Sequence, residues 1–180
     1  LSIDQNPFTE SSPYMPSSPY AASKASSDHL VRSWGRTFGL PFTITNCSNN
    51  FGPFQHREKF IPKTILNLIS GKKVPIYGDG NQIRDWLFVE DHAKALHILI
   101  DNKKNYDTYN IGAKNERTNK EIAKLVCSIL EDKMVEKPNN IKKYSDLITH
   151  VEDRPGHDLR YALDPSRFEN EFTWKTDESF

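Results

Sequence analysis

Apolar and polar positions first follow a regular spacing after residue 17. Residues 1–17 contain three prolines and no period, which is typical of an extended loop. From Ser18 the pattern predicts a helix that ends near Phe38, because Ser18 suits the N-cap, a proline suits the first helical position and Gly39 suits the end. The alternation of β-branched and polar residues over 42–47 then predicts a strand.

Helices and strands are predicted to alternate along the rest of the chain. Residues 48–58 have turn chemistry, and residues 133–144 form a charged linker or loop. Predicted helices lie at about 61–70, 93–100, 119–130 and 165–171, and predicted strands at 73–78, 83–89, 107–112 and 148–151. This alternation favours a layered α/β architecture. Because a long helix precedes any strong strand and the end is abrupt, we expect a piece of a larger fold.

Composition narrows the possible partners. The 24 basic and 24 acidic residues give a formal net charge of zero, so neither nucleic acid nor an anionic membrane is an expected partner. No leader opens the chain and no apolar run approaches about 18 residues, so we expect a soluble, cytoplasmic protein. Cys47 and Cys127 lie in apolar runs without C-x-x-C spacing, which favours free thiols over a disulfide. The histidines show no usual metal-ligand spacing, so no metal is expected.

The segment SPYAASKASSDHL places Tyr20 and Lys24 four residues apart near the start of the predicted helix. Residues at that spacing project from one helix face. One interpretation is a surface pair. The other is an acid–base pair, in which the ammonium lowers the pKa of the phenol so that its phenolate can take a proton from a sugar hydroxyl. Small residues surround the pair and would let a flat group or another helix approach closely.

Other polar positions allow both a binding and a structural interpretation. Asn49 and Asn50 follow a predicted strand, where α/β folds place ligand contacts, but they could also be ordinary turn residues. Arg84 lies in or beside a strand and suits a diphosphate, although an ion pair with Asp85 would also account for it. Asn119 stands at a predicted helix start, a position suited to phosphate recognition.

Five separated blocks resemble a known family. The blocks PYAASKASSDHLVRSW, TNCSNNFGP, PIYGDGNQIRDWLFVEDHAKAL, YNIGAKNERTN and VEDRPGHDLRY together closely resemble the dTDP-glucose 4,6-dehydratases, which are extended short-chain dehydrogenases/reductases. The resemblance runs from about Pro7 to the end. It implies an NAD-dependent reaction in which the sugar C4 hydroxyl is oxidised, water is lost across C5 and C6, and the hydride returns to C6.

The resemblance also implies roles for individual residues. Tyr20 would be the active-site base, Lys24 would hold the nicotinamide ribose of NAD, and Asn50 would face the nicotinamide end. The substrate dTDP-glucose would lie against Asn49, Lys59, Phe60, Pro75, Ile76, Tyr77, Arg84, Asn119, Asp153, Arg154, Pro155, Gly156 and His157. Core or surface positions remain the alternative for Lys59, Phe60 and residues 75–77. A second helix face (Leu30, Val31, Trp34 and Phe38) would join a homodimer interface or pack in the core.

The implied fold is part of an NAD(P)-binding Rossmann-like fold plus a smaller α/β substrate-binding domain. Residues 1–58 would form the distal part of the former, and residues 59–180 mainly the latter, with segments that return to the Rossmann sheet. Two family features are missing, because no glycine fingerprint occurs and neither Asp4 nor Glu10 reproduces the acid–base set of the elimination. We therefore expect this chain alone to be inactive.

Two other functions remain open from the sequence. One is a related epimerase or decarboxylase of a UDP-sugar, although the blocks that contain Arg84 and Asp153 favour the dehydratase. The other is a non-catalytic sugar-nucleotide-binding or dimerisation module, against which the retained Tyr20 and Lys24 argue. Rhamnose synthesis is the usual destination of the product in the family. We interpret the helical histidines, His29, His92 and His97, as packing or surface groups.

Overall fold

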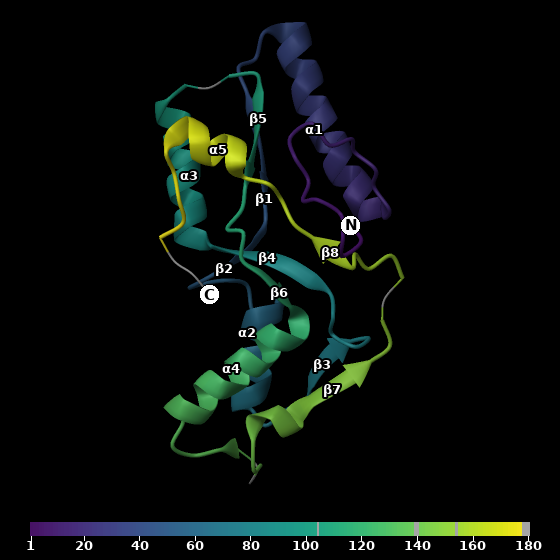
Figure 1. Cartoon of the computed structure of the whole chain (residues 1–180), viewed down its shortest axis with the longest axis vertical. Coiled ribbons are helices and arrows are strands. Elements are labelled where there is room, and N and C mark those ends of the chain that lie inside the picture. Colours follow the sequence, from purple (N-terminus) through teal and green to yellow (C-terminus); the bar gives the residue numbers. More distant parts are fainter. Residues whose placement is uncertain (104, 139–140, 154, 178–180) are drawn as a thin grey trace.

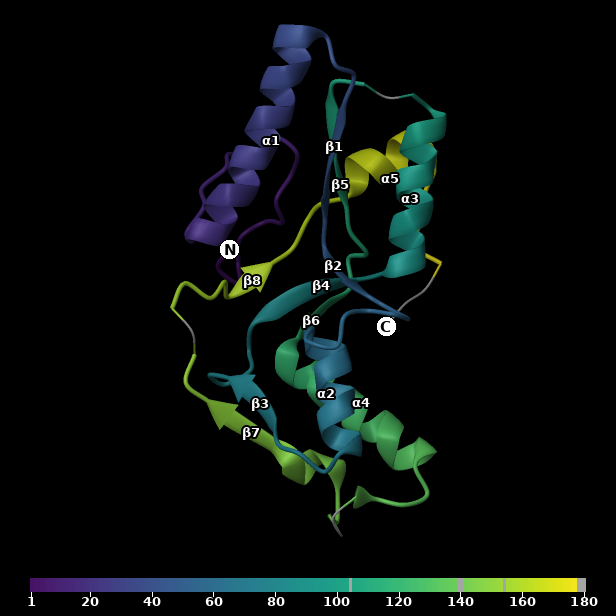
Figure 2. The same ribbon diagram turned by 180° about the vertical axis from the view of Figure 1, so that it is seen from behind.

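The computed structural model describes residues 1–103, 105–138, 141–153 and 155–177. Its elements are α1 (Pro19–Phe38), β1 (Thr43–Cys47), β2 (Asn49–Phe51), α2 (Phe60–Ile69), β3 (Val74–Tyr77), β4 (Ile83–Phe88), α3 (Val89–Asp101), β5 (Asp107–Ile111), β6 (Glu116–Thr118), α4 (Asn119–Lys133), the 3₁₀-helix η2 (Tyr144–Leu147), β7 (Ile148–Val151), β8 (Arg160–Tyr161) and α5 (Ser166–Phe172). Figures 1 and 2 show α1, β1, β5, α3 and α5 in an upper region, with α2, α4, β3 and β7 in a lower region. The layered α/β architecture is as predicted.

Helix α1 begins and ends at the predicted residues. Ser18 Oγ accepts a hydrogen bond from the Ala21 N–H at 3.2 Å. At the other end Gly39 adopts a φ of 67°, and its N–H donates to the Gly35 carbonyl. A Cβ at Gly35 would lie 2.2 Å from a Phe42 ring atom. Glycine at position 35 therefore allows α1 to approach the chain that leads into β1.

The upper region is built on β1 and β5, which pair in parallel from Thr43 opposite Asp107 to Cys47 opposite Ile111. Its core consists of Leu87, Ala95, Leu99, Tyr109, Ile111, Phe168 and Trp174. The rings of Tyr109 and Phe168 meet edge to face with centroids 5.9 Å apart. Because α5 returns to this core, the end of the described chain stabilises strands that come much earlier in the sequence.

The lower region has a separate core between α2, α4 and the parallel pair of β3 and β7. Its buried residues are Leu68, Val74, Ile76, Ala123, Val126, Cys127, Leu130, Tyr144 and Leu147. Helix α4 begins with a capping box, in which Thr118 Oγ1 accepts from the Glu121 N–H and the Glu121 carboxylate accepts from the Thr118 N–H. Local side chains thus set the start of the helix that contributes Ala123, Val126, Cys127 and Leu130 to this core.

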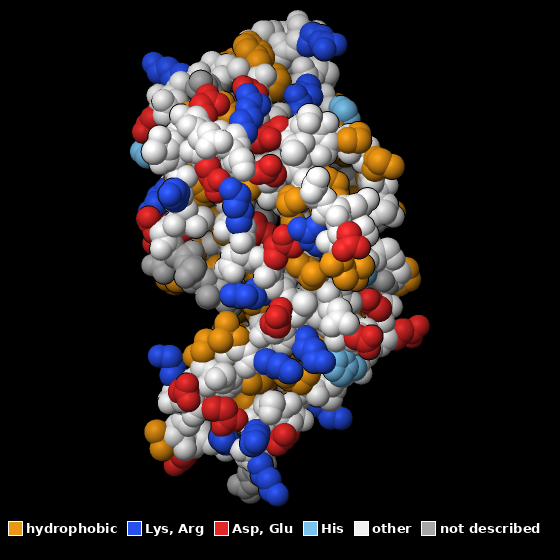
Figure 3. All heavy atoms as spheres, in the orientation of Figure 1, with side chains coloured by type: hydrophobic (Ala, Val, Ile, Leu, Met, Phe, Trp, Pro, Cys, Tyr) orange, Lys and Arg blue, Asp and Glu red, His pale blue; other side chains and the backbone are white. Residues whose placement is uncertain are grey.

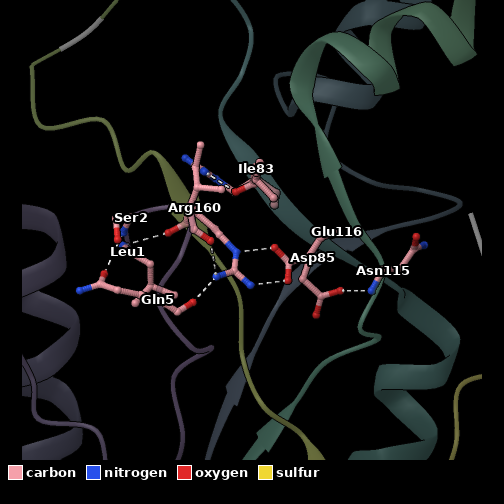
Figure 4. A network of polar contacts seen from close by, with 10 residues as sticks. Leu1, Ser2, Gln5, Ile83, Asp85, Asn115, Glu116 and Arg160 are labelled. Carbon is pink, nitrogen blue, oxygen red and sulfur yellow. Dashed lines mark hydrogen bonds and ion pairs between the residues drawn. The ribbon is translucent and has the colours of Figure 1, made fainter.

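Strand β4 links the two regions. It pairs in parallel with β2 and β8 and antiparallel with β6. Arg160 of β8 makes a bidentate ion pair with Glu116 of β6, with both N–O distances 2.6 Å, and also donates to the carbonyl oxygen of Gln5 (Figure 4). This hydrogen bond holds residues 1–17 beside the same strands, although these residues contain no helix or strand of their own.

Some predictions of local structure are wrong. Residues 49–51 form β2 instead of a turn, because they find a partner in β4. The sequence does not predict β6 or β8, which are short and depend on pairing with the same distant strand. Helix α3 begins at Val89, four residues before the predicted start. The sequence also does not predict the 3₁₀-helix η2, which begins at the last residue of the predicted linker. The remaining elements agree with the predictions apart from small shifts at their ends.

Candidate active site

Helix α1 presents Tyr20 and Lys24 to solvent. Both residues lie in its first turns, four positions apart, so their side chains project from the same side of the helix. Tyr20 is 76% exposed, and Lys24 is exposed as well. The phenol is therefore accessible to a ligand and does not serve the hydrophobic core.

Lys24 and Asn50 both influence the Cys47 thiol, which lies at the carboxyl end of β1. Burial raises the pKa of Cys47, whereas a hydrogen bond from the Asn50 side chain and the positive charge of Lys24 act in the opposite direction. The two groups thus act on one sulfur atom, although one comes from α1 and the other from β2. The carboxyl ends of parallel strands are also where α/β folds bind ligands. The electrostatic influence of Lys24 and the hydrogen bond of Asn50 thus both reach the thiol at this end of β1.

Asn50 is held at three points. Its Nδ2 donates to the Ser48 carbonyl at 2.9 Å, its Oδ1 lies 2.8 Å from His92 Nδ1, and its backbone carbonyl accepts from Gln55 Nε2 at 2.7 Å. Asn49 and Asn50 are consecutive residues of β2, so their side chains point to opposite faces. Asn49 is exposed and Asn50 is half-buried. The interpretation of both as left-handed turn residues is therefore wrong.

A second polar cluster joins β3 to the segment between β7 and β8. Asp153 Oδ1 lies 2.7 Å from His157 Nδ1, and Asp153 Oδ2 accepts from Gln82 Nε2 at 2.7 Å. Gln82 Nε2 also donates to the Tyr77 carbonyl at 3.2 Å. The Tyr77 and His157 rings meet edge to face, with centroids 6.1 Å apart. These contacts bring together three of the residues that the resemblance places at the substrate.

The pairing of β4 with β6 sets the positions of Arg84 and Asn119. The pairing is antiparallel, with Ile83 opposite Thr118 and Arg84 opposite Arg117, so Asn119 lies beside Gln82, on the other side of the Ile83–Thr118 pair from Arg84. The Asn119 N–H donates to the Gln82 carbonyl at 3.0 Å. Asn119 is the first residue of α4, where helix N–H groups favour an anion. Arg84 thus lies two residues after Gln82, whose carbonyl accepts from the first N–H of α4.

Arg84 and Asp85 are held by different groups. Arg84 donates to the Asp158 carbonyl at 2.8 Å. Asp85 is buried and accepts from the backbone N–H groups of Ala113 and Asn115 at 3.0 and 2.7 Å, the second of which is visible in Figure 4. Consecutive strand residues point to opposite faces. An ion pair between Arg84 and Asp85 therefore does not account for the position of the arginine.

Several predicted substrate residues also contribute to the fold. Phe60 packs on the lower core, with its ring 6.3 Å from that of Trp86. Ile76 is 1% exposed, so its side chain belongs to that core. Pro75 and Tyr77 alternate with it and are exposed. Lys59, which precedes α2, is exposed too.

The segment that leads to β8 carries the remaining predicted residues. Gly156 has a φ of 71°, a conformation that side chains disfavour. Pro155 is exposed. Arg154, which the resemblance also places at the substrate, lies outside the described residues.

Sequence reasoning did not identify two residues of these clusters. Gln82 is 5% exposed, and its side chain donates to the Tyr77 carbonyl and to the Asp153 carboxylate of the second cluster. His92 contacts Asn50, although its helical position suggested a packing or surface group. His92 and Asn50 are 42 positions apart in the sequence, and Gln82 and Asp153 are 71 positions apart. No local sequence pattern could therefore reveal these contacts.

The described residues also bear on metal binding, membrane spanning and disulfide formation. In the described ranges, no group of three His, Cys, Asp or Glu side chains could hold a metal ion. No helix of this part of the chain is long and apolar enough to cross a membrane. Cys47 and Cys127 are free thiols, which confirms the prediction against a disulfide.

The fold is that of an extended short-chain dehydrogenase/reductase, and comparison with known proteins shows the family. A family model described as "GDP-mannose 4,6 dehydratase" matches residues 2–180, so the chain belongs to that family. It is 57% identical over 173 residues to a dTDP-glucose 4,6-dehydratase of Neisseria meningitidis, an alignment that covers 96% of this chain and 49% of the relative. The chain spans about half the length of the curated relatives it matches.

Solved structures show the same relationship. The structure of a dTDP-glucose 4,6-dehydratase from Bacillus anthracis in complex with NAD superposes with a TM-score of 0.85 at 40% identity, and covers 98% of this chain and 53% of its own. The dehydratase DesIV from Streptomyces venezuelae, with NAD and TYD bound, gives a TM-score of 0.87 at 40% identity over 99% and 52%. The predicted resemblance and fold class are confirmed. The roles of individual residues stay predictions.

Proposed function

We propose that this chain carries the base, the nicotinamide-end contacts and the sugar-nucleotide contacts of an NAD-dependent dTDP-glucose 4,6-dehydratase, a lyase. The observation that carries the proposal is the exposed pair of Tyr20 and Lys24 on one face of α1, together with Asn50 in β2, which follows the carboxyl end of β1. The 57% identity to a dehydratase of dTDP-glucose supports the choice of substrate.

The chemistry assigned to the first cluster is proton transfer and cofactor binding. Tyr20 takes the proton of the sugar C4 hydroxyl, and Lys24 donates to the ribose of the nicotinamide nucleoside. The ammonium of Lys24 and the amide of Asn50 fit the hydroxyl and carboxamide groups at that end of NAD. When bound, with its nicotinamide end held by Lys24 and Asn50, NAD would supply the hydride acceptor and donor for the reaction. The sequence holds no glycine-rich loop for the pyrophosphate, so we expect the chain alone to be inactive.

The second cluster and its neighbours are assigned to the sugar nucleotide. Arg84 suits a diphosphate because its planar guanidinium matches phosphate oxygens, and Asn119 lies at the adjacent helix start. The exposed Tyr77 beside the Asp153–His157 pair offers an aromatic surface to the nucleoside. The full proposed set is Asn49, Lys59, Phe60, Pro75, Ile76, Tyr77, Arg84, Asn119, Asp153, Arg154, Pro155, Gly156 and His157.

We also propose a division into residues 1–58, as the distal part of the Rossmann-like domain, and residues 59–180, as mainly the sugar-nucleotide-binding domain. The separate upper and lower cores support this division. Helices α3 and α5 and strand β5 belong to the upper core, which agrees with segments that return to the Rossmann sheet.

A homodimer through α1 is part of the same proposal. Leu30, Trp34 and Phe38 are exposed on this helix, and Figure 3 shows hydrophobic side chains at the surface along the side where α1 lies. A shared apolar face of this kind favours self-association.

The free thiols of Cys47 and Cys127 support a reducing, cytoplasmic location. The product would supply rhamnose synthesis, the usual destination in the family.

The test uses the protein as expressed from its own gene. With NAD present, dTDP-glucose should become a 4-keto-6-deoxy sugar nucleotide, recognised by mass spectrometry as the loss of one water and by NMR as a new methyl group. Turnover of a UDP-sugar without turnover of dTDP-glucose would favour an epimerase or decarboxylase. Tight binding of dTDP-glucose without any turnover would favour a binding module.

A further inference from the structure

His92 lies in the first turns of α3 and contacts β2 through Asn50. Its Nδ1 is 2.8 Å from Asn50 Oδ1. The imidazole is half-buried, and among the described residues its Nε2 is buried without a hydrogen-bond partner. The side chain is thus neither a surface group nor an apolar packing group.

The proton on this imidazole can be placed from the neighbouring groups. The Ser48 carbonyl can only accept, so the Asn50 amide must turn its Nδ2 toward that carbonyl, as the 2.9 Å contact shows. Asn50 Oδ1 then faces His92 and needs a donor. Nδ1 of His92 therefore carries the proton, and Nε2 carries the lone pair. The other tautomer would place two acceptors 2.8 Å apart.

Burial also favours the neutral form of the His92 imidazole. It lowers the pKa of His92, because a charged imidazolium would be poorly solvated there. The neutral ring with its proton on Nδ1 is then the form that faces Asn50 at neutral pH. One lone pair of Asn50 Oδ1 is engaged by His92, which leaves a second for a donor from outside the protein.

We propose that His92 is a positioning residue, whose Nδ1–H, together with the Ser48 carbonyl, fixes the Asn50 amide so that its oxygen can accept a hydrogen bond from the nicotinamide end of the cofactor. The proposal rests on the proposed function, since it takes Asn50 as the residue at that end. His92 does not itself contact the reacting atoms. Its effect is on the orientation of one amide.

The first test measures the tautomer by NMR of the protein as expressed from its own gene, labelled with ¹⁵N-histidine. His92→Asn identifies the resonances of His92. The expected result is a protonated, pyrrole-type Nδ1 and an unprotonated, pyridine-type Nε2. The reverse pattern would overturn the proposal, whatever the enzyme's activity.

The second test compares two variants of similar shape. His92→Asn can keep an N–H donor near the position of Nδ1, whereas His92→Leu removes it. We expect His92→Leu to lower kcat by about tenfold, the ratio that corresponds to losing one hydrogen bond, with the KM for dTDP-glucose nearly unchanged and with most of kcat restored in His92→Asn. His97→Leu is the control, because that side chain is exposed on the same helix.

The outcomes separate this role from the proposed function. Equal losses in His92→Leu and His92→Asn, or wild-type kcat in His92→Leu, would overturn the positioning role while the dehydratase activity stands. A protein that turns over no sugar nucleotide would overturn both.

Discussion

Helices α1 and α4 differ in how they are stabilised. Every residue of both is described, and α1 buries Gly35 alone among its 20 residues, whereas α4 buries Ile122, Ala123, Val126, Cys127 and Leu130 among its 15. Helix α4 lies against the lower core. Helix α1 depends more on its caps and on polar contacts, such as the 2.6 Å hydrogen bond from Arg32 to Thr108.

The proposed base lies on the less buried of these helices. A side chain that must meet a ligand cannot also be fixed by the core, so Tyr20 is exposed and its placement depends on the helix start. Apolar side chains of α1 are exposed as well (Figure 3). The comparison teaches that stability and activity should separate: substitutions in α1 should affect activity or association, and substitutions in α4 should affect folding.

The largest expected effect is on catalysis, from Tyr20→Phe in the protein as expressed from its own gene. Loss of a general base typically costs about a hundredfold to ten-thousandfold in kcat. Because Tyr20 is exposed, the melting temperature of the Tyr20→Phe variant should remain close to that of the wild type. Tyr14→Phe is the matched control, since that phenol donates to Asp28 at the surface. A drop in kcat of less than tenfold for Tyr20→Phe would contradict its role as the base.

The next effect is on stability, from Ile122→Ala in α4. Ile122 is fully buried, so truncation should lower the free energy of unfolding by about 2–5 kcal/mol. Trp34→Ala in α1 removes a larger side chain that is 54% exposed, and should change the stability of the monomer by only about 0.5 kcal/mol. Chemical denaturation measures both, and sedimentation should show weaker self-association for Trp34→Ala. Equal losses of monomer stability would contradict the comparison.

Local sequence was sufficient where local chemistry sets the structure. Ser18 and Gly39 bound α1 as predicted, and Thr118 with Glu121 fixes the start of α4. It was insufficient where pairing is long-range: Asn49 and Asn50 have turn chemistry but pair with β4. The site shows the same division. The spacing of Tyr20 and Lys24 is a local signal, but Gln82 and His92 acquire their partners through tertiary contacts.

A smaller effect should come from the helix caps, where the two helices can be compared by one chemical change. Thr118→Ala and Ser18→Ala each remove a side chain that accepts from a helix N–H, which costs about 1 kcal/mol. In α4 this should appear as lower global stability. In α1 it should appear as faster amide exchange around Tyr20 and a reduced kcat. Slower turnover without faster exchange would contradict fraying as the cause.

The smallest effect should be on the pH dependence of the stability that Glu121 contributes at the start of α4. Hydrogen bonds from the Thr118 N–H and side chain lower the pKa of Glu121 in the folded state. The resulting stabilisation is present above the pKa of glutamate in the unfolded chain, about 4.3, and is lost as pH falls through the lower folded value. Glu121→Gln keeps an acceptor but cannot ionise, so its stability relative to the wild type should rise on acidification. Glu152→Gln, at an exposed position, is the control, and equal curves for wild type and Glu121→Gln would show that the capping carboxylate contributes no pH-dependent stability.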